Sequence, residues 1–467
     1  MNKTKIIATV GPSCNNPKDL IQLMDSGVVC FRVNLSHGSD IEKSQYFDLL
    51  RSLESHCGKR PSILADLSGP KIRVGLLNKS IKINKGDKWE IASEKRKGLI
   101  IPVSEGVKFK KVNQGAKILI DDGKIGFKVI EQLSHQALVC EAINGGIINS
   151  RKGVNFPNIA LKVPTLTKQD EKDLRLSLEK NADWIALSFI RSHRDYNVLR
   201  SKIQESGQNT PIVAKIEKWE AIQDLDRIVK KFDAIMIARG DLGVEIPMAK
   251  VPIIQKNIIE KANKNGKPVI LATQILDSMI ERQVPTRAEI SDIANAIIDG
   301  ADALMVTGET AVGKNPKKVV QVLNGTIKET ESLISNNQVF QHSKKKIKTG
   351  RAISHASCSV ARDMGINILV TMTHSGSTAK MIARYRPSAN IIAMTPFKRI
   401  CRQLLIVWGV KPILVKEYNS TDDIPGIIDT ALKEHGLIKK GEKFIVTGGV
   451  PVGKPGTTNY LSVLKSS

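Results

Sequence analysis

The sequence has no long apolar run, few acidic residues for its basic ones and no closely paired cysteines, and each absence excludes a class of protein. No apolar stretch in the 467 residues approaches the ~18 residues that cross a bilayer, so no membrane partner is expected. The first residues lack the apolar core of a signal peptide, which predicts a cytoplasmic protein. The six cysteines are scattered without a CxxC pair, which argues against a zinc site and a disulfide framework.

The charge balance predicts anionic partners. Lys and Arg number 71 against 46 Asp and Glu, which gives a net charge of +25. Aromatic residues make up only 4% of the chain, so few side chains can stack on single-stranded bases. No zinc-finger, RNP or basic-zipper motif is visible. Small phosphorylated ligands explain the charge with fewer assumptions, and we expect no nucleic-acid partner.

Short β-rich apolar runs alternate with helical patterns, which is typical of parallel α/β proteins. Eight β/α units predict a (β/α)8 TIM barrel. The runs occupy 5–11, 29–36, 62–68, 184–190, 211–217, 234–240, 268–273 and 303–309. Between them, Thr286 and Glu289 form a capping-box pattern, and Gly300 can end that helix in the left-handed conformation. Thr167 and Asp170 mark another helix start.

Two stretches interrupt this rhythm and predict further domains. Residues 70–153 contain short alternating runs and turn signals, which indicate a small β-barrel domain inserted after the third barrel strand. The barrel would then comprise 1–69 and 154–337. A polar, basic stretch near 336–350 is followed by strand-like runs at 368–373, 391–395, 413–416 and 443–447. These runs predict an open α/β domain over 338–467.

Polar side chains recur at the C-terminal ends of the predicted barrel strands, where chemistry sits in such barrels. They are Arg32, Asn34, Asp66, Ser188, Lys215, Glu217, Arg239, Asp241, Thr273, Thr307 and Glu309. Any one charged member could form a salt bridge in a barrel layer. Several at the same end are costly to bury unless they bind a ligand.

Three of these residues suggest a reaction that involves negative charge. Glu217 and Asp241 could hold a hard cation such as Mg²⁺, although each could instead pair with a Lys or Arg. Lys215 lies two residues before Glu217, so both point from the same strand face. A cation there suits a transferring phosphoryl group or an enolate. The segment from Gly240 can start a helix whose N–H groups bind an anion, or it can be a simple turn.

Several motifs resemble those of the pyruvate kinase family, in family order over nearly the whole chain. They are TKIIATVGPS (4–13), FRVNLSHG (31–38), DLSGPKIR (66–73), KGVNFP (152–157), KIE (215–217), MIARGDLGVEIP (236–247), ATQILDSM (272–279), PTRAEISDIANAIIDGADALMVTGETAVG (285–313) and ARYRP (383–387). The resemblance implies a catalytic barrel, a lid inserted after strand three and a regulatory α/β domain. It also implies a homotetramer. The implied reaction is glycolytic: phosphoenolpyruvate and ADP give pyruvate and ATP. A metal-dependent lyase or aldolase that handles enolpyruvate is the alternative, but it would need neither the lid nor the C-terminal domain.

The resemblance also implies residue roles. Glu217 and Asp241 would bind Mg²⁺ or Mn²⁺, and Lys215 would stabilise the transferring phosphoryl group and the enolate. Arg32 would bind the substrate phosphate, the Gly240 and Asp241 amides its carboxylate, and Thr273 would sit where the enolate is protonated. The positions that match nucleotide-binding residues are Asn34, His37, Arg73 and Lys152. Arg73 and Lys152 lie at the lid junctions, so the lid would close over the site and exclude water.

The monovalent-cation region departs from the family pattern. The K⁺ ligands of many members match Asn34, Ser36, Asp66 and the position of Leu67. Leu67 lacks a side-chain oxygen where K⁺-dependent members usually have Thr, and Lys71 stands where they usually have Glu. An ammonium can replace a monovalent cation electrostatically, which predicts an enzyme without a K⁺ requirement. Alternatively, Lys71 simply extends into solvent from the lid junction.

A hydroxyl-rich loop follows the first predicted strand of the C-terminal domain and precedes a helix expected from Ala379. Its hydroxyl and N–H groups could cradle a phosphate, or they could be a plain N-cap cluster. In pyruvate kinases the matching loop binds the phosphate of an activating sugar phosphate. The effector residues implied here are Thr373, Ser375, Gly376, Ser377 and Thr378.

Overall fold

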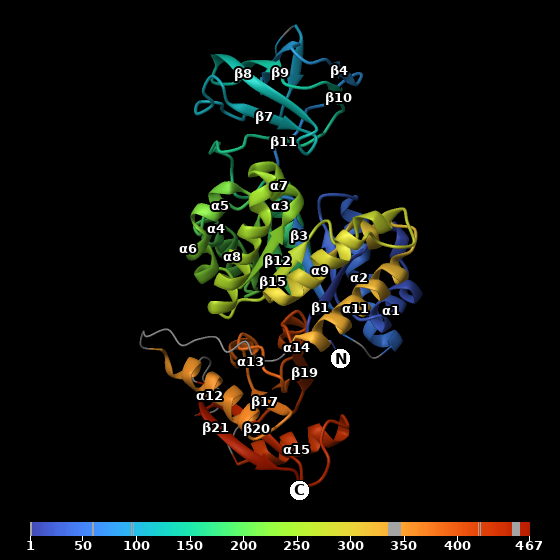
Figure 1. The fold of residues 1–467 in the computed structure, drawn as a ribbon, viewed down its shortest axis with the longest axis vertical. Helices are drawn as coiled ribbons and strands as arrows, with labels where there is room; N and C mark the ends of the chain where they lie inside the picture. The colour runs from blue at the N-terminus through green and yellow to red at the C-terminus, as the bar shows by residue number, and fades with distance from the viewer. Residues whose placement is uncertain are drawn as a thin grey trace.

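The computed structural model describes residues 2–57, 60–94, 96, 98–334, 347–418, 420, 422–450 and 458–467. The predicted domain limit at 337/338 and most of the basic stretch near 336–350 lie outside the described residues. Figure 1 shows three bodies stacked along the long axis, with a β domain at one end, a barrel in the middle and an α/β domain at the other end. The middle body positions the polar strand ends.

The middle body is a closed barrel of eight parallel strands, in the order β1-β16-β15-β14-β13-β12-β3-β2, as the sequence predicted. The strands are β1 (Lys5–Thr9), β2 (Val28–Asn34), β3 (Ser62–Leu67), β12 (Trp184–Leu187), β13 (Ile212–Ile216), β14 (Ala234–Ala238), β15 (Val269–Ala272) and β16 (Ala303–Val306). Their apolar side chains fill the barrel and the layer beneath the helices.

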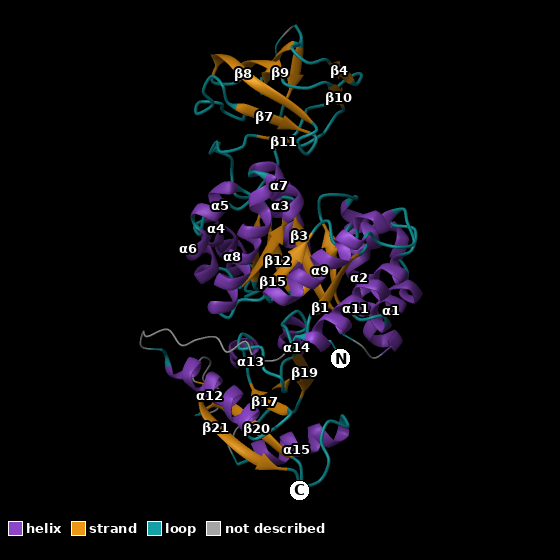
Figure 2. Cartoon of the chain, in the orientation of Figure 1, coloured by secondary structure: helices purple, strands orange, loops and turns teal. Residues whose placement is uncertain are grey.

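Helices surround the barrel strands (Figure 2). They are α1 (Pro17–Asp25), α2 (Asp40–Cys57), α3 (Lys168–Glu179), α4 (Asp195–Glu205), α5 (Trp219–Gln223), α6 (Leu225–Lys231), α7 (Arg239–Glu245), α8 (Val251–Lys264), α9 (Arg287–Asp299), α10 (Gly308–Ala311) and α11 (Pro316–Leu333), with short 3-10 turns at η1 (Pro12–Cys14), η2 (Met248–Lys250) and η3 (Asp277–Ile280). The predicted capping box is present at the start of α9, and the predicted helix start at Thr167 is a capping box as well, at the start of α3. Gly300 ends α9 at φ 99°, in the left-handed region that favours glycine.

All eight predicted barrel strands exist, but each ends before its predicted limit because the residues that follow turn into loops or short helices. The predicted strand 303–309 stops at Val306, and α10 begins at Gly308. Glu309 is consequently a buried residue of α10, where it accepts hydrogen bonds from the backbone N–H groups of Leu276 and Thr307. Glu309 therefore stabilises the loops that follow β15 and β16 and does not face the mouth of the barrel as a ligand-binding residue.

The inserted domain consists of a six-stranded sheet, in the order β11-β7-β8-β9-β5-β6, and the pair β10-β4. Its strands are β4 (Ile81–Ile83), β5 (Lys88–Ala92), β6 (Ile100–Pro102), β7 (Lys117–Ile120), β8 (Ile125–Ser134), β9 (Ala137–Ala142), β10 (Gly146–Ile148) and β11 (Val154–Asn155). In the described residues the ladder does not close into a full barrel. Arg73 and Val74 instead make single bridges to Gly153 and Val103, next to the two edge strands.

The C-terminal domain has a five-stranded sheet in the order β19-β18-β17-β20-β21. Its elements are α12 (Thr349–Asp363), β17 (Ile368–Met372), α13 (Ser377–Ala383), β18 (Asn390–Thr395), α14 (Lys398–Leu404), β19 (Val410–Leu414), α15 (Ile424–Glu434), β20 (Lys443–Gly449) and β21 (Thr458–Lys465). The four predicted strands are present, although β19 begins and ends earlier than the predicted 413–416. The antiparallel β21 was not predicted, because a half-exposed edge strand has a weak apolar pattern.

Two expectations from the sequence can be compared directly with the described residues. None of the helices in these ranges is long and apolar enough to cross a membrane. The cysteines whose side chains are described (Cys14, Cys30, Cys140, Cys358 and Cys401) are free thiols. Burial raises the pKa of the Cys140 thiol to about 12, so this cysteine is a core residue rather than a nucleophile.

Candidate active site

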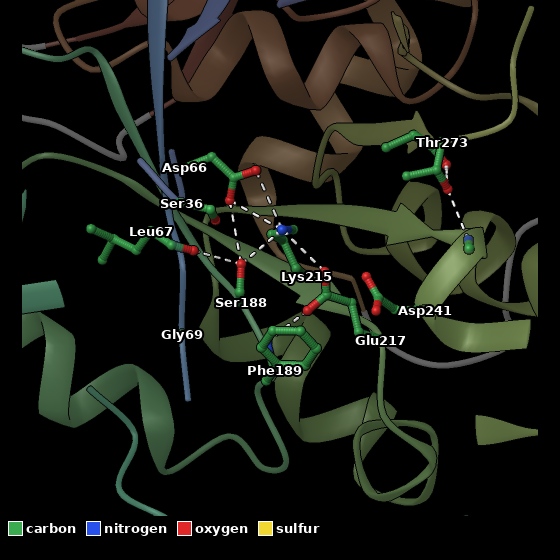
Figure 3. A network of polar contacts seen from close by, with 12 residues as sticks. Ser36, Asp66, Leu67, Gly69, Ser188, Phe189, Lys215, Glu217, Asp241 and Thr273 are labelled. Atoms are coloured by element: carbon green, nitrogen blue, oxygen red, sulfur yellow. Dashed lines mark hydrogen bonds and ion pairs between the residues drawn. The ribbon is translucent and has the colours of Figure 1, made fainter. Parts of the chain in front are cut away.

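Lys215 lies at the centre of a polar network at the C-terminal mouth of the barrel (Figure 3). Its Nζ is 3.1 Å from Oδ1 of Asp66 and 3.0 Å from Oε1 of Glu217, and it donates a 2.7 Å hydrogen bond to Oγ of Ser188. Burial alone would lower the pKa of Lys215, but the two carboxylates outweigh burial and raise it above its usual value. The side chain is therefore a permanently charged ammonium at neutral pH.

Asp66 joins Lys215 to Arg32 on the neighbouring strand. Nε of Arg32 lies 2.7 Å from Oδ2 of Asp66, and the guanidinium side chain is 12% exposed. Burial raises the pKa of Asp66, but Lys215 and Arg32 outweigh that effect and the pKa lies below its usual value. The pair thus holds a guanidinium at the mouth of the barrel, beside the ammonium, where an anion can reach both.

Glu217 and Asp241 provide the carboxylates for a hard cation. Burial raises the pKa of Glu217, Lys215 opposes this effect, and the nearby Asp241 carboxylate reinforces it. Figure 3 shows both carboxylates facing the same space. A divalent cation fits this pair because it would neutralise two interacting carboxylates with the oxygen ligands it prefers. No cluster of three or more metal-ligating side chains occurs in the described ranges, so waters and substrate oxygens would complete the coordination.

Strained backbone at the end of β12 supports Glu217. Phe189 has φ 55°, and its N–H donates a 2.7 Å hydrogen bond to Oε2 of Glu217. Gly69, at φ 68°, packs against this turn, and a Cβ at position 69 would lie 2.8 Å from the Ser188 carbonyl oxygen. Both the conformation and the close approach require glycine there. Sequence analysis identified neither the Phe189 N–H nor this packing, because backbone groups leave no residue-type signature.

Thr273 and Gly240 lie together. Thr273 has φ 65°, and its Oγ1 accepts a 2.9 Å hydrogen bond from the N–H of Gly240 in the first turn of α7. The Arg239 guanidinium holds this turn by donating to the carbonyls of Thr273 and Gln274, and it also pairs with Asp292. Arg239 is therefore a structural residue. The positive φ of Thr273 is a strained backbone conformation of the kind that clusters at functional sites.

The predicted monovalent-cation residues are only partly brought together. Oδ1 of Asn34 accepts from the Ser36 N–H at 3.2 Å, and the Leu67 carbonyl accepts a 2.6 Å hydrogen bond from Ser188. Lys71 does not extend freely into solvent, nor does it pair with Asp66. Its Nζ lies 2.7 Å from Oδ1 of Asp241, with the two side chains 18% and 24% exposed.

The predicted nucleotide residues form two groups. Asn34 and the exposed His37 lie at and beyond the end of β2 on the barrel. Arg73 and Lys152 lie together where the chain enters and leaves the inserted domain, since the Val74 N–H donates to the Lys152 carbonyl at 2.8 Å. Nζ of Lys152 lies 2.9 Å from Asp121 in the inserted domain, and its hydrogen bond to that carboxylate raises the pKa of Lys152. The side chains of Arg73 and Lys152 are both partly exposed.

The predicted effector loop connects β17 to α13, and the helix begins at Ser377 rather than at Ala379. Two of its hydroxyls are internal. Thr373 accepts a 2.9 Å hydrogen bond from the Gly376 N–H, and Thr378 bonds to the Thr458 hydroxyl at 2.8 Å. Ser375 is exposed and Ser377 is half-buried. Only these two serines are therefore available to an external ligand without breaking a hydrogen bond of the fold.

Comparison with known families agrees with this geometry. The family model described as the barrel domain of pyruvate kinase matches residues 1–320, and the model described as its alpha/beta domain matches residues 351–464. The chain belongs to the pyruvate kinase family. It is accordingly an enzyme, a kinase of the phosphotransferase class.

Individual pyruvate kinases are similar along the whole chain. The pyruvate kinase of Clostridium acetobutylicum is 40% identical over 99% of this chain and 99% of its own length. Pyruvate kinase 2 of Synechocystis sp. is 39% identical over 99% of this chain and 79% of its own length. The crystal structure of a pyruvate kinase from Cryptosporidium parvum superposes with a TM-score of 0.93 at 33% identity, over 100% of this chain and 96% of that one.

Proposed function

We propose that the protein transfers the phosphoryl group of phosphoenolpyruvate to ADP, with Mg²⁺ held by Glu217 and Asp241. The observation that carries the proposal is the buried Lys215 ammonium, which lies within 3.1 Å of both Asp66 and Glu217 at the mouth of a pyruvate kinase barrel. The bond between phosphorus and the enol oxygen breaks, and a bond to a β-phosphate oxygen of ADP forms. The enolate then takes a proton at its methylene carbon to give pyruvate.

Each site residue has a task in this reaction. Lys215 stabilises negative charge on the phosphoryl oxygens and on the enolate, and its raised pKa keeps it charged. Arg32, fixed by Asp66, binds the substrate phosphate. The first-turn amides of α7, at Gly240 and Asp241, bind the carboxylate, and the Gly240 N–H exchanges the Thr273 hydroxyl for a carboxylate oxygen when it does so. Thr273 orients the proton donor to the enolate. A divalent cation held by Glu217 and Asp241 would supply positive charge that offsets the charge of the substrate oxygens.

The nucleotide would bind between the two groups of residues described above. Arg73 and Lys152 belong to the junctions of the inserted domain, whereas Asn34 and His37 belong to the barrel. A phosphate chain that contacts both groups would draw the inserted domain toward the barrel. Closure would exclude water, which would otherwise compete with ADP as the phosphoryl acceptor.

A coupled assay tests this function against the alternative. With phosphoenolpyruvate, ADP and Mg²⁺, we expect pyruvate to form in an ADP-dependent reaction, detected through lactate dehydrogenase. A lyase or aldolase that handles enolpyruvate would form or consume pyruvate without ADP. Absence of ADP-dependent pyruvate formation in freshly prepared, folded protein would overturn the proposal.

We also propose that the reaction needs no K⁺. Arg32 and Lys215 already neutralise Asp66, the Leu67 carbonyl is engaged by Ser188, and Lys71 adds positive charge to the same mouth. Replacing K⁺ by Na⁺ or tetramethylammonium should therefore change the rate by less than about twofold. The rate is measured at constant ionic strength, and a many-fold loss without K⁺ would contradict the proposal.

A phosphorylated metabolite is proposed to activate the enzyme from the loop before α13. Support comes from the exposed Ser375 and half-buried Ser377, which precede and begin that helix. Losing two hydrogen bonds to a charged phosphate should raise the activating concentration by about tenfold or more. Ser375→Ala with Ser377→Ala is assayed against sugar phosphates and AMP. Thr373 and Thr378 are left intact because they hold the loop, and unchanged activation would reject the site.

A further inference from the structure

Both junctions of the inserted domain are fastened to the same short helix, α7. Asp241, in its first turn, pairs with Lys71 on the first junction at 2.7 Å. Glu245, its last residue, accepts a 2.7 Å hydrogen bond from Nδ2 of Asn155 on the second junction. Figure 1 shows α7 at the top of the barrel, beneath β11 of the inserted domain. Helix α7 thus contains a proposed metal ligand and also contacts both junctions of the inserted domain.

The Lys71–Asp241 and Asn155–Glu245 contacts differ in how easily a solute can reach them. The Glu245 side chain is fully buried and also pairs with Nζ of Lys218, on the loop after β13. Asn155 is buried as well, so an ion from solution cannot reach the Asn155–Glu245 contact without opening the fold, and this contact is a lasting one. The Lys71–Asp241 pair is partly exposed on both sides, and its carboxylate faces the space shared with Glu217.

The residues around Lys71 form a binding position for its ammonium group. Its Nζ lies 5.6 Å from the centre of the Phe189 ring and 3.9 Å from Oδ1 of Asp122, in a turn of the inserted domain. Gly153 leaves the room for the stem, because a Cβ there would lie 2.8 Å from Cε of Lys71. The aromatic face and Asp122 would still attract the ammonium if Asp241 took another partner.

We propose that Lys71 is an internal counter-ion of Asp241, which a divalent cation must displace, and that this displacement releases the Lys71–Asp241 contact between the first junction of the inserted domain and α7. The inference rests on the proposed role of Asp241 as a metal ligand. An ammonium and a divalent cation cannot share one carboxylate oxygen without strong repulsion. Lys71 then remains near Phe189 and Asp122, and the Asn155–Glu245 contact stays as the pivot about which the inserted domain moves.

The first test measures binding of Mn²⁺ alone to the full chain, without substrates, by electron paramagnetic resonance of the free ion. Lys71→Met and Lys71→Gln should each bind Mn²⁺ more tightly than the unaltered protein, by on the order of tenfold, because no ammonium competes for Asp241. The matched control is Lys124→Met. Lys124 pairs with Asp121 in the neighbouring turn at 3.2 Å and should leave the affinity unchanged. Affinity that is equal or weaker in both Lys71 variants would overturn the proposal.

The second readout is amide hydrogen exchange around both junctions, at residues 71–75 and 155–156; Gly153 and Val154 are left out because they pair with the first junction, Val154 by donating its N–H to the Ile72 carbonyl. In the unaltered protein, Mn²⁺ should speed exchange at the first junction and leave the second unchanged. In Lys71→Met the first junction should exchange fast already, with no further effect of Mn²⁺. Identical exchange in all four samples would refute the release.

A third variant, Glu217→Gln, separates this inference from the proposed function. If it leaves Mn²⁺ binding unchanged, the metal site itself is wrong. If it weakens Mn²⁺ binding while the Lys71 variants bind like the unaltered protein, only the counter-ion proposal fails.

Discussion

Lys215→Met is expected to lower kcat by about 10²–10³-fold, because it removes a preorganised positive charge from the place where phosphoryl and enolate charge develops. Methionine fills a similar volume, so the loss should fall mainly on kcat. The KM for phosphoenolpyruvate should rise less, since Arg32 still holds its phosphate. Steady-state kinetics with the coupled assay measure both constants, and a variant that loses less than about threefold in kcat would remove Lys215 from the mechanism.

The same substitution should also cost stability, which requires a matched control. Removing one partner of a buried ion pair costs about 3–5 kcal/mol, because Asp66 and Glu217 would keep buried charge without their cation. Lys43→Met is the control, since Lys43 and Asp173 form a buried pair at 2.7 Å between α2 and α3, outside the mouth. It should destabilise the protein comparably, as measured by thermal unfolding, and leave kcat nearly unchanged.

The pH dependence of this stability difference has a definite sign. The pKa of Lys215 is raised in the fold, so its contribution is complete below its ordinary pKa and lost only as pH rises through the raised value. The unaltered protein should therefore keep this contribution across the neutral range. Without Lys215, the pKa values of Asp66 and Glu217 should move up. The variant should approach the unaltered protein in stability as pH falls from 8 toward 5.5, because its buried carboxylates then take up protons.

The barrel and the members of its polar mouth were predictable because their signals are local. Alternating β and α segments give the barrel, and parallel strands deliver Arg32, Asp66 and Lys215 to one end without any knowledge of contacts. The contacts that could not be predicted are those between segments far apart in the sequence. The ion pair of Lys71 with Asp241 joins residues separated by 170 positions, and the Phe189 N–H owes its role to a backbone dihedral angle. Neither leaves a pattern in neighbouring residue types.

The same distinction explains the effector loop. Its hydroxyl content predicted a phosphate cradle, but residue types do not show which hydroxyls the fold itself uses. Thr378 bonds to Thr458, on a strand that the sequence pattern did not reveal. Predicting that contact would have required the position of β21, which was missed because its residues alternate weakly at an exposed edge.

Glu217→Gln is expected to weaken binding of the divalent cation by about 10–100-fold, and to lower activity at fixed Mg²⁺ accordingly. A neutral amide oxygen is a poorer ligand than a carboxylate, and only Asp241 would remain as a charged ligand. The measurements are the Mg²⁺ dependence of the coupled assay and Mn²⁺ binding to the free protein. Excess Mg²⁺ should recover part of the activity, whereas binding equal to that of the unaltered protein would exclude Glu217 as a ligand.

The effect of Glu217→Gln on stability should be smaller than that of a purely structural carboxylate, which separates the two kinds of residue. The amide loses one of the two acceptor oxygens used by Lys215 and the Phe189 N–H, but burial raises the pKa of Glu217, so at pH 8 a neutral side chain recovers part of that loss in thermal unfolding with a chelator. Any difference should shrink as pH falls and Glu217 takes up a proton. Glu309→Gln is the contrasting control at the same barrel end. Because Glu309 accepts two backbone N–H groups, its amide variant should lose stability and keep its affinity for Mn²⁺. A binding carboxylate is thus one whose replacement costs mainly metal affinity, whereas the replacement of a structural carboxylate costs mainly stability.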